Sequence, residues 1–90
     1  MRELAVSMAG HDRGEVYAVL REEDGWVFLV NGKNRTLDAP KKKNLRHVQR
    51  IRRLPDEAAR VLGAAVRDED VVYALRLYGA AVRAQSAEAD

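Results

Sequence analysis

The sequence predicts one small, mainly β domain, a barrel of short strands followed by one or two α-helices. A chain of 90 residues is the size of one domain, and such a chain buries only about 60 to 70% of the surface that it exposes when unfolded. Short segments of strand-forming composition, separated by glycine-rich or Asn-Gly turns, occupy the first half. Helix formers take over after Pro55. We expect residues 1–54 to form the barrel, because closure protects strand edges, and residues 55–90 to form an acidic helical extension.

The first two expected strands flank a loop that contains two glycines. Leu4, Val6 and Met8 alternate with smaller or polar residues, and residues 15–20 resume a strand-forming composition. Between them, residues 9–14 read Ala-Gly-His-Asp-Arg-Gly. Two glycines four positions apart predict a tight loop that needs positive φ or a close approach of the backbone.

A third strand is expected at residues 26–30, which read Trp-Val-Phe-Leu-Val after the charged turn at residues 21–25. The absence of alternation predicts burial on both faces, so the aromatic side chains Trp26 and Phe28 are expected in the core.

A hairpin is expected next, because Asn31-Gly32 is a favoured pair for a two-residue type I′ turn. The chain would return through residues 33–37 as an antiparallel strand, and Pro40 would end the pairing. Farther on, apolar residues recur at every third position, a spacing that suits neither a strand nor a helix. Those residues are Leu45, Val48, Ile51 and Leu54. Periodicity alone leaves that segment undecided.

One or two helices are expected after Pro55, because residues 63–67 either separate two helices or bend a single one. Asp56 and Glu57 suit the first turn of one helix, and Asp68 is a plausible N-cap for a second. The second helix would carry an apolar stripe that packs back onto the barrel. The stripe comprises Val71, Leu75, Tyr78 and Val82.

Positive charge gathers in one part of the chain, although the net charge is only +2. Residues 1–55 carry twelve Lys or Arg against seven Asp or Glu, whereas residues 56–90 carry four against seven. Residues 33–53 hold nine of the cations and only one acid, Asp38. Such clustering is typical of proteins that bind polyanions.

The segment from Val6 to Val19, a strand, the loop Ala-Gly-x-Asp-x-Gly and another strand, resembles the KOW motif. Residues 31–37 and 40–48 look like the continuation seen in bacterial KOW-domain RNA-binding proteins, which are similar to the large-subunit ribosomal protein numbered fourteen of archaea and eukaryotes. The resemblance covers residues 3–54. It implies a five-stranded SH3-like barrel in which the KOW loop joins the first two strands, favours a strand near residues 45–51, and implies binding of ribosomal RNA, with ribosomal proteins as further partners.

The expected RNA site combines this loop with the neighbouring cations. Exposed glycines let a backbone approach phosphate closely, and Lys or Arg side chains release counterions from it. The alternative is that the glycines only permit the turn, and Asp12 is expected to hydrogen-bond the loop backbone. Replacing the lysines of residues 41–43 by glutamate is expected to abolish binding without lowering the thermal midpoint. The expected RNA-binding residues are Gly10, His11, Arg13, Gly14, Lys33, Arg35, Lys41, Lys42, Lys43, Arg46 and His47.

Other function classes lack sequence support. No nucleophile motif or Walker loop is present, and two histidines without cysteine make a zinc site improbable. We therefore expect a non-enzyme without a cofactor. The longest apolar run is too short to span a bilayer, and nothing resembles a signal peptide, so a cytoplasmic protein is expected. The competing hypothesis is a protein-interaction module, similar to the KOW domains of transcription elongation factors, that binds through the acidic helical segment.

Overall fold

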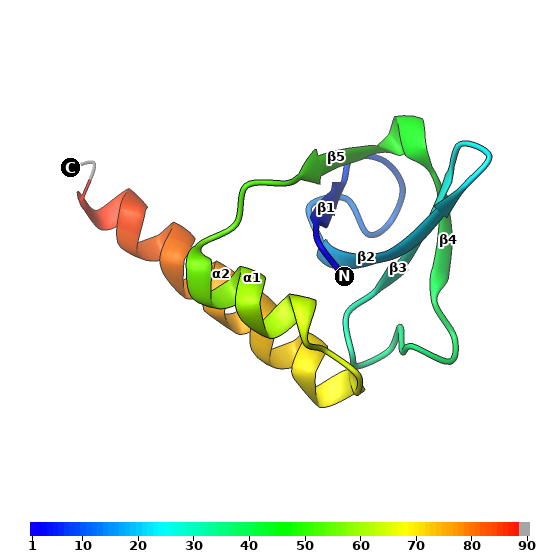
Figure 1. Ribbon diagram of the computed structural model, residues 1–90. Helices are drawn as coiled ribbons and strands as arrows, with labels where there is room; N and C mark the ends of the chain where they lie inside the picture. Colours follow the sequence, from blue (N-terminus) through cyan, green and yellow to red (C-terminus); the bar gives the residue numbers. More distant parts are fainter. Residues whose placement is uncertain (89–90) are drawn as a thin grey trace.

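The computed structural model describes the backbone of residues 1–88 and the side chains of residues 1–86. Figure 1 shows a five-stranded antiparallel sheet with two helices packed beside it. The order of the strands in the sheet is β4-β3-β2-β1-β5. The elements are β1 (Leu4–Ser7), β2 (Val16–Glu23), β3 (Trp26–Val30), β4 (Lys41–Asn44), the 3-10 helix η1 (Leu45–His47), β5 (Val48–Ile51), α1 (Asp56–Gly63) and α2 (Asp68–Glu88). The prediction of five strands followed by one or two helices is confirmed, and there are two helices. The expectation of a mainly β chain is wrong, because the two α-helices hold 8 and 21 residues, more than the five strands of 4, 8, 5, 4 and 4 residues.

The sheet curls strongly but does not close into the expected barrel. β4 and β5 are its two edges, and η1 turns the chain so sharply between them that they run in different directions (Figure 1). β5 therefore pairs with β1 and not with β4. Ion pairs link β5 to its own side of the sheet, since the Arg50 guanidinium lies 2.6 Å from a Glu3 carboxylate oxygen and 2.7 Å from one of Glu22 in β2.

The hairpin predicted at Asn31-Gly32 is wrong, and residues 33–37 are not a strand. The Asn31 side chain accepts hydrogen bonds from the backbone N–H groups of Lys33 and Arg35, both at 3.0 Å, and folds residues 31–40 into a loop. The strand that pairs with β3 is β4, which starts directly after Pro40. A local side-chain bond thus overrides the turn preference of the Asn-Gly pair.

Asp68 does not play the expected N-cap role, because its carboxylate accepts a hydrogen bond of 2.9 Å from the backbone N–H of Leu37. This bond ties the 31–40 loop to the start of α2. The neighbouring Asp70 carboxylate accepts instead from the backbone N–H groups of Val66 and Arg67, each at 3.0 Å.

Two apolar clusters hold the fold together. One lies between the sheet and the helices and contains Leu4, Ala18, Val30, Leu62, Val71 and Ala74, all buried. The other fills the concave side of the sheet and contains Ala5, Tyr17, Val19, Val27 and Leu29. Because both helices contribute to the first cluster, α1 and the first part of α2, up to Tyr78, share a core with the sheet, whereas residues 82–86 are exposed. The predicted stripe of α2 joins it only in part, since Val82 remains 40% exposed.

The expectation that Trp26 and Phe28 lie in the core is wrong for Trp26, which is exposed, and holds only partly for Phe28. Residues 26–29 of β3 alternate, so that Val27 and Leu29 are buried while the two aromatic rings lie on the opposite, outer face. Among residues 1–88, no helix is long and apolar enough to cross a membrane.

Candidate nucleic-acid interface

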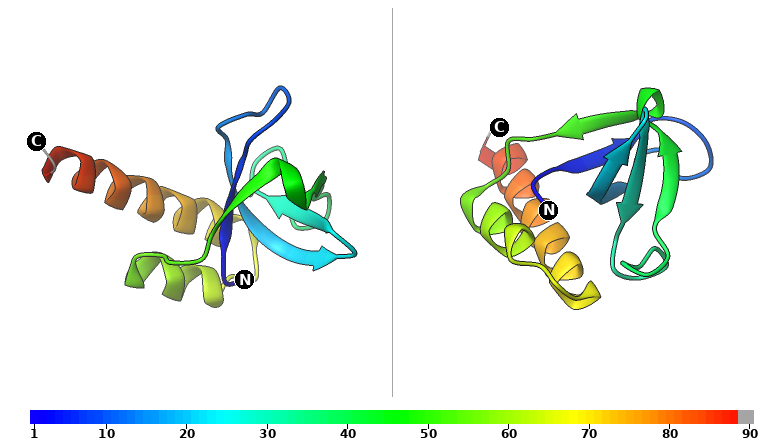
Figure 2. Two further views of the ribbon diagram at one scale, coloured as in Figure 1. Left: turned by 90° about the horizontal axis from the view of Figure 1, so that it is seen from above. Right: turned by 45° about the vertical axis from the view of Figure 1, so that its right-hand side comes forward.

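The glycine loop, residues 8–15, joins β1 to β2 and projects on the side away from both helices (Figure 2). Gly10 and Gly14 have φ angles of 85° and 91°, which confirms the predicted left-handed conformation. Both glycines are exposed. The helices therefore leave the backbone of this loop open to a ligand.

Asp12 is the centre of a hydrogen-bonded cluster that fixes the glycine loop. Its carboxylate accepts from the hydroxyls of Ser7 and Tyr17 at 2.7 and 2.8 Å, and from the ammonium groups of Lys41 and Lys43 at 2.8 and 3.0 Å. The Asp12 side chain was expected to hydrogen-bond the loop backbone, and this is wrong. It bonds other side chains instead, because the fold places two lysines of β4 next to it. These five residues are called the Asp12 cluster below.

The protonation states of this cluster follow from its contacts. Burial by itself would raise the pKa of Asp12, but the hydrogen bonds from Lys41, Ser7, Lys43 and Tyr17 outweigh it and hold the pKa well below its usual range. Burial, and then the bond to Asp12 and its charge, raise the pKa of Tyr17 to about 12. At neutral pH Asp12 is thus ionised and Tyr17 protonated, so the cluster is suited to holding the loop in place.

Strand geometry divides the three consecutive lysines between the two faces of the sheet. Lys41 and Lys43 pair in register with the buried residues Leu29 and Val27, so their side chains lie on the concave side and reach Asp12. Lys43 also donates to the Ala9 carbonyl oxygen at 2.9 Å, and its side chain is only 11% exposed. Lys42 lies on the outer face. The expectation that glutamates at these three positions would leave the stability unchanged is therefore wrong, because two of them would face Asp12.

A polar pocket of about 390 Å³ lies between the glycine loop and the 31–40 loop. The pocket brings together residues that are far apart in the sequence. It is lined by His11, Asp12, Glu15, Tyr17, Asn31, Asn34, Arg35 and Lys41. Three members of the predicted site, His11, Arg35 and Lys41, thus converge here, and two acids lie beside them.

The other residues of the predicted site do not line this pocket. Arg46 and His47 belong to η1, which is joined to the glycine loop by a hydrogen bond of 2.8 Å from the Met8 N–H to the His47 carbonyl. Within residues 1–86, five cations of the predicted site make no ion pair and are available to a ligand. They are Arg13, Lys33, Arg35, Lys42 and Arg46.

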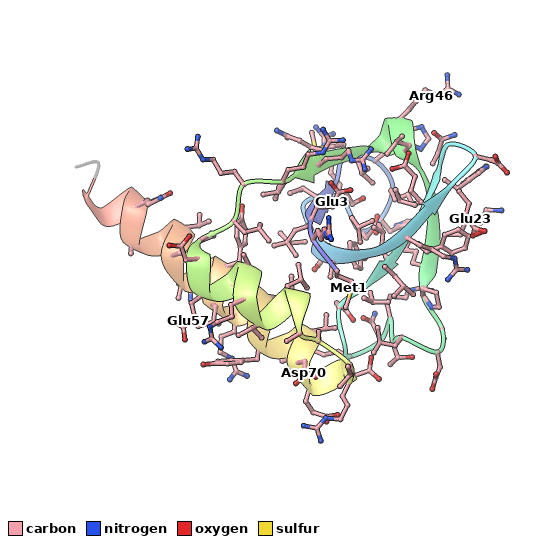
Figure 3. All side chains as sticks on the ribbon, in the orientation of Figure 1. Met1, Glu3, Glu23, Arg46, Glu57 and Asp70 are labelled. Carbon is pink, nitrogen blue, oxygen red and sulfur yellow. The ribbon has the colours of Figure 1, made fainter. Side chains whose placement is uncertain are left out.

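The helical segment carries more acids than cations, whereas cations and acids are mixed on the sheet. Arg46 points outward from η1, and Glu57 and Asp70 lie on the helical side (Figure 3). Glu3 and Glu23, however, lie on the side of the sheet in the same view. Several acids on the side of the sheet, Glu3, Asp12 and Glu22, are held in ion pairs.

The sequence analysis missed Trp26 and Phe28 as surface residues, and with them Arg21. The signal was present, because the large apolar side chains of residues 26–29 alternate between aromatic and aliphatic, which is the period of a half-exposed strand.

Within residues 1–88, no three His, Asp or Glu side chains gather as ligands for a metal ion. Comparison of the chain with protein-family models and with curated proteins gives no match.

Proposed function

We propose that this protein is a non-catalytic RNA-binding protein, associated with the ribosome, that holds ribosomal RNA of the large subunit by its phosphates. The observation that carries the proposal is the exposed glycine loop beside the polar pocket, which Arg35 lines. Arg13 of the glycine loop, and Lys33 and Arg35 of the 31–40 loop, make no ion pair within residues 1–86. Exposed loop backbone and converging cations are the features that a phosphate backbone requires.

The strand arrangement supports the finer assignment, an SH3-like fold of the KOW type. The five strands have the order β4-β3-β2-β1-β5, and the motif loop joins β1 to β2 as the resemblance implies. A single 3-10 turn connects β4 to β5. The sheet is curled but not closed, because its edge strands β4 and β5 do not pair with each other.

In the proposed RNA binding, the Asp12 cluster holds the glycine loop in its conformation and does not itself contact RNA. Lys41 and Lys43 are held by Asp12, so the cations that reach phosphate are those without an ion pair, above all Arg13, Lys33 and Arg35. Each phosphate that they neutralise contributes a little under one unit to the salt dependence of binding. Recognition then depends on RNA shape and phosphate positions, since the grooves of A-form RNA offer little sequence readout to side chains.

The competing function, a protein-interaction module that binds through its acidic helices, has less support. Leu62, Val71 and Ala74 are buried against the sheet. Among residues 55–86, such a partner would find only Val66, Tyr73 and Val82 as large exposed apolar side chains. We therefore prefer the RNA-binding function.

The test compares two variants of the full chain that lose the same charge. The site variant carries Arg13→Gln, Lys33→Gln and Arg35→Gln, and the control carries Arg60→Gln, Arg76→Gln and Arg83→Gln on the helices. Fluorescence anisotropy with large-subunit ribosomal RNA fragments, repeated over a range of salt concentrations, measures the affinity.

The site variant is expected to lose about two to three units of salt slope and at least about tenfold in affinity. The control should keep the slope of the unchanged protein. Equal losses of affinity and salt slope in the two variants would mean that binding depends only on net charge, and would reject the proposed site.

A further inference from the structure

The outer face of β2, β3 and β4 carries the only tryptophan and the only phenylalanine of the sequence. In register, Phe28 pairs with Arg21 on one side and with Lys42 on the other, and Trp26 pairs with Asn44. Opposing residues of antiparallel strands point to the same face. We call the surface formed by Arg21, Trp26, Phe28 and Lys42 the aromatic face.

Each ring of the aromatic face is in contact with a cation and does not belong to either apolar cluster. The Arg21 guanidinium carbon lies 4.0 Å from the centre of the Phe28 ring, and the Lys42 ammonium lies 4.7 Å from the centre of the Trp26 ring. Trp26 is 38% exposed, whereas the cores consist mainly of aliphatic side chains. A large ring of this kind stabilises a fold most when it is buried, so its position on the surface calls for another role.

The aromatic face adjoins the proposed phosphate site across a single strand. β4 is an edge of the sheet, and its lysines alternate, with Lys41 at the polar pocket and Lys42 over Trp26. An RNA strand held by its phosphates at the pocket can therefore pass over this edge and present its next bases to the rings.

Glu23, which pairs in register with Trp26, is held in an ion pair, whereas Asp24 in the adjoining turn makes none within residues 1–86. The Glu23 carboxylate lies 2.8 Å from the Arg21 guanidinium nitrogen, so it does not oppose an approaching phosphate as a free charge would. Lys42 and the neighbouring Arg46 remain without an ion pair within residues 1–86.

We propose that the aromatic face is a stacking site for unpaired bases of the RNA that the polar pocket holds by its phosphates, an inference that rests on the proposed function. Trp26 receives one base, and the stacked pair of Arg21 and Phe28 offers a second planar surface, because bases stack on guanidinium groups as well as on aromatic rings. Lys42 moves from the ring to a flanking phosphate. The site is tolerant of sequence, since every base has a π face.

The sequence provides its own reporter, because Trp26 is the only tryptophan. A mixed-sequence single-stranded RNA of about 12 nucleotides, within the site size of single-strand-binding modules, is titrated into the full protein at low salt. Binding is followed by anisotropy of a label on the RNA and by the intrinsic tryptophan emission. A duplex of the same length serves as the comparison, because its bases are not free to stack.

Quenching of the emission that saturates together with the anisotropy is expected with the single strand, and much weaker quenching with the duplex. Trp26→Leu should lower the affinity for the single strand about 5- to 100-fold, and Trp26→Phe should retain it within about fivefold. Tyr73→Leu is the control, because Tyr73 is a 45% exposed aromatic residue on α2, and it should bind like the unchanged protein. Thermal melts check that the variants remain folded.

The outcomes separate the two proposals. RNA that binds by anisotropy without quenching, with undiminished affinity for Trp26→Leu, overturns the stacking site and leaves the phosphate site in place. Binding to the large-subunit ribosomal RNA fragments of the first test without binding to the single strand overturns the stacking site alone. Absence of binding to the single strand, to the duplex and to those fragments overturns the proposed function and the stacking site together.

Discussion

Replacing Asp12 by asparagine tests the claim that one carboxylate organises the glycine loop. The carboxylate accepts four hydrogen bonds, two of them from ammonium groups. An asparagine keeps one oxygen that can accept, but its amide N–H₂ would face a donor, and the negative charge is lost. Lys43 is almost buried and cannot regain full hydration.

The magnitude follows from these contacts. A hydrogen bond to a charged group contributes about 1.5 to 3 kcal/mol, and losing the acceptor of a buried donor costs a similar amount. We count the bond to Lys43 in full and the bond to Lys41 in part, because Lys41 can turn to solvent. Asp12→Asn should therefore lower the free energy of unfolding by about 2 to 4 kcal/mol.

Urea denaturation followed by circular dichroism measures this loss. With a denaturant slope of about 1 kcal/mol per molar, at the lower end of the range for small proteins, the midpoint should fall by about 2 M or more. Asp38→Asn is the matched control, because Asp38 is exposed and should change the free energy by less than about 0.5 kcal/mol. A loss below about 1 kcal/mol for Asp12→Asn would refute the idea that the cluster fixes the loop.

Three further predictions follow from the same contacts. The pKa of Asp12 is lower in the folded protein than the value of about 3.9 expected for an unfolded chain. At acid pH the folded state therefore binds fewer protons than the unfolded state. The stability that ionised Asp12 contributes is complete above about pH 5 and is lost as the pH falls. The difference in unfolding free energy between the unchanged protein and Asp12→Asn should narrow by about 1 kcal/mol from pH 5 to pH 3 in urea titrations, and a constant difference would contradict the assignment. Gly32→Ala should destabilise the protein more than Gly25→Ala, although both glycines have positive φ. A Cβ at Gly32 would overlap the Asp68 carbonyl oxygen and lie 2.8 Å from a Val72 methyl carbon, whereas a Cβ at Gly25 would meet no neighbour within 4 Å. In urea denaturation the unfolding free energies of the two variants should differ by about 1 to 3 kcal/mol, and equal losses would contradict this prediction. Leu62→Ala should lower the free energy of unfolding by about 2 to 4 kcal/mol, because Leu62 is buried between α1 and the sheet. Val66→Ala is the control and should leave this free energy nearly unchanged, because Val66 is 78% exposed. Similar thermal melts for the two variants would mean that the helices do not share the core.

The local sequence was sufficient for residues 4–20 and for the helical segment, but not for residues 31–37, where bonds to the Asn31 side chain form a loop in place of the expected hairpin. The strand, glycine loop and strand of residues 4–20 were predicted, as were the helix that starts after Pro55 and a second helix near Asp68. Positive φ at Gly10 and Gly14 followed from residue type and spacing alone. The excess of cations in residues 33–53 was likewise visible as composition.

The tertiary structure decided where those residues point and what they contact. Residues 33–37 form a loop because the Asn31 side chain bonds the backbone there and Asp68, 31 residues from Leu37, holds the end of the loop. Register against β3 sent Lys42 to one face and its two neighbours to the other.

The sequence by itself determined the strands and loop of residues 4–20, the helical segment after Pro55, the glycines with positive φ and the excess of cations before Pro55, because these depend on residue type and short-range geometry. Only the tertiary structure decided that two lysines bind Asp12, that Trp26 faces outward and that β4 and β5 remain apart. The physical reason is that a strand's two faces become distinguishable only when its register with its neighbours is set, and that register depends on contacts between residues distant in the chain.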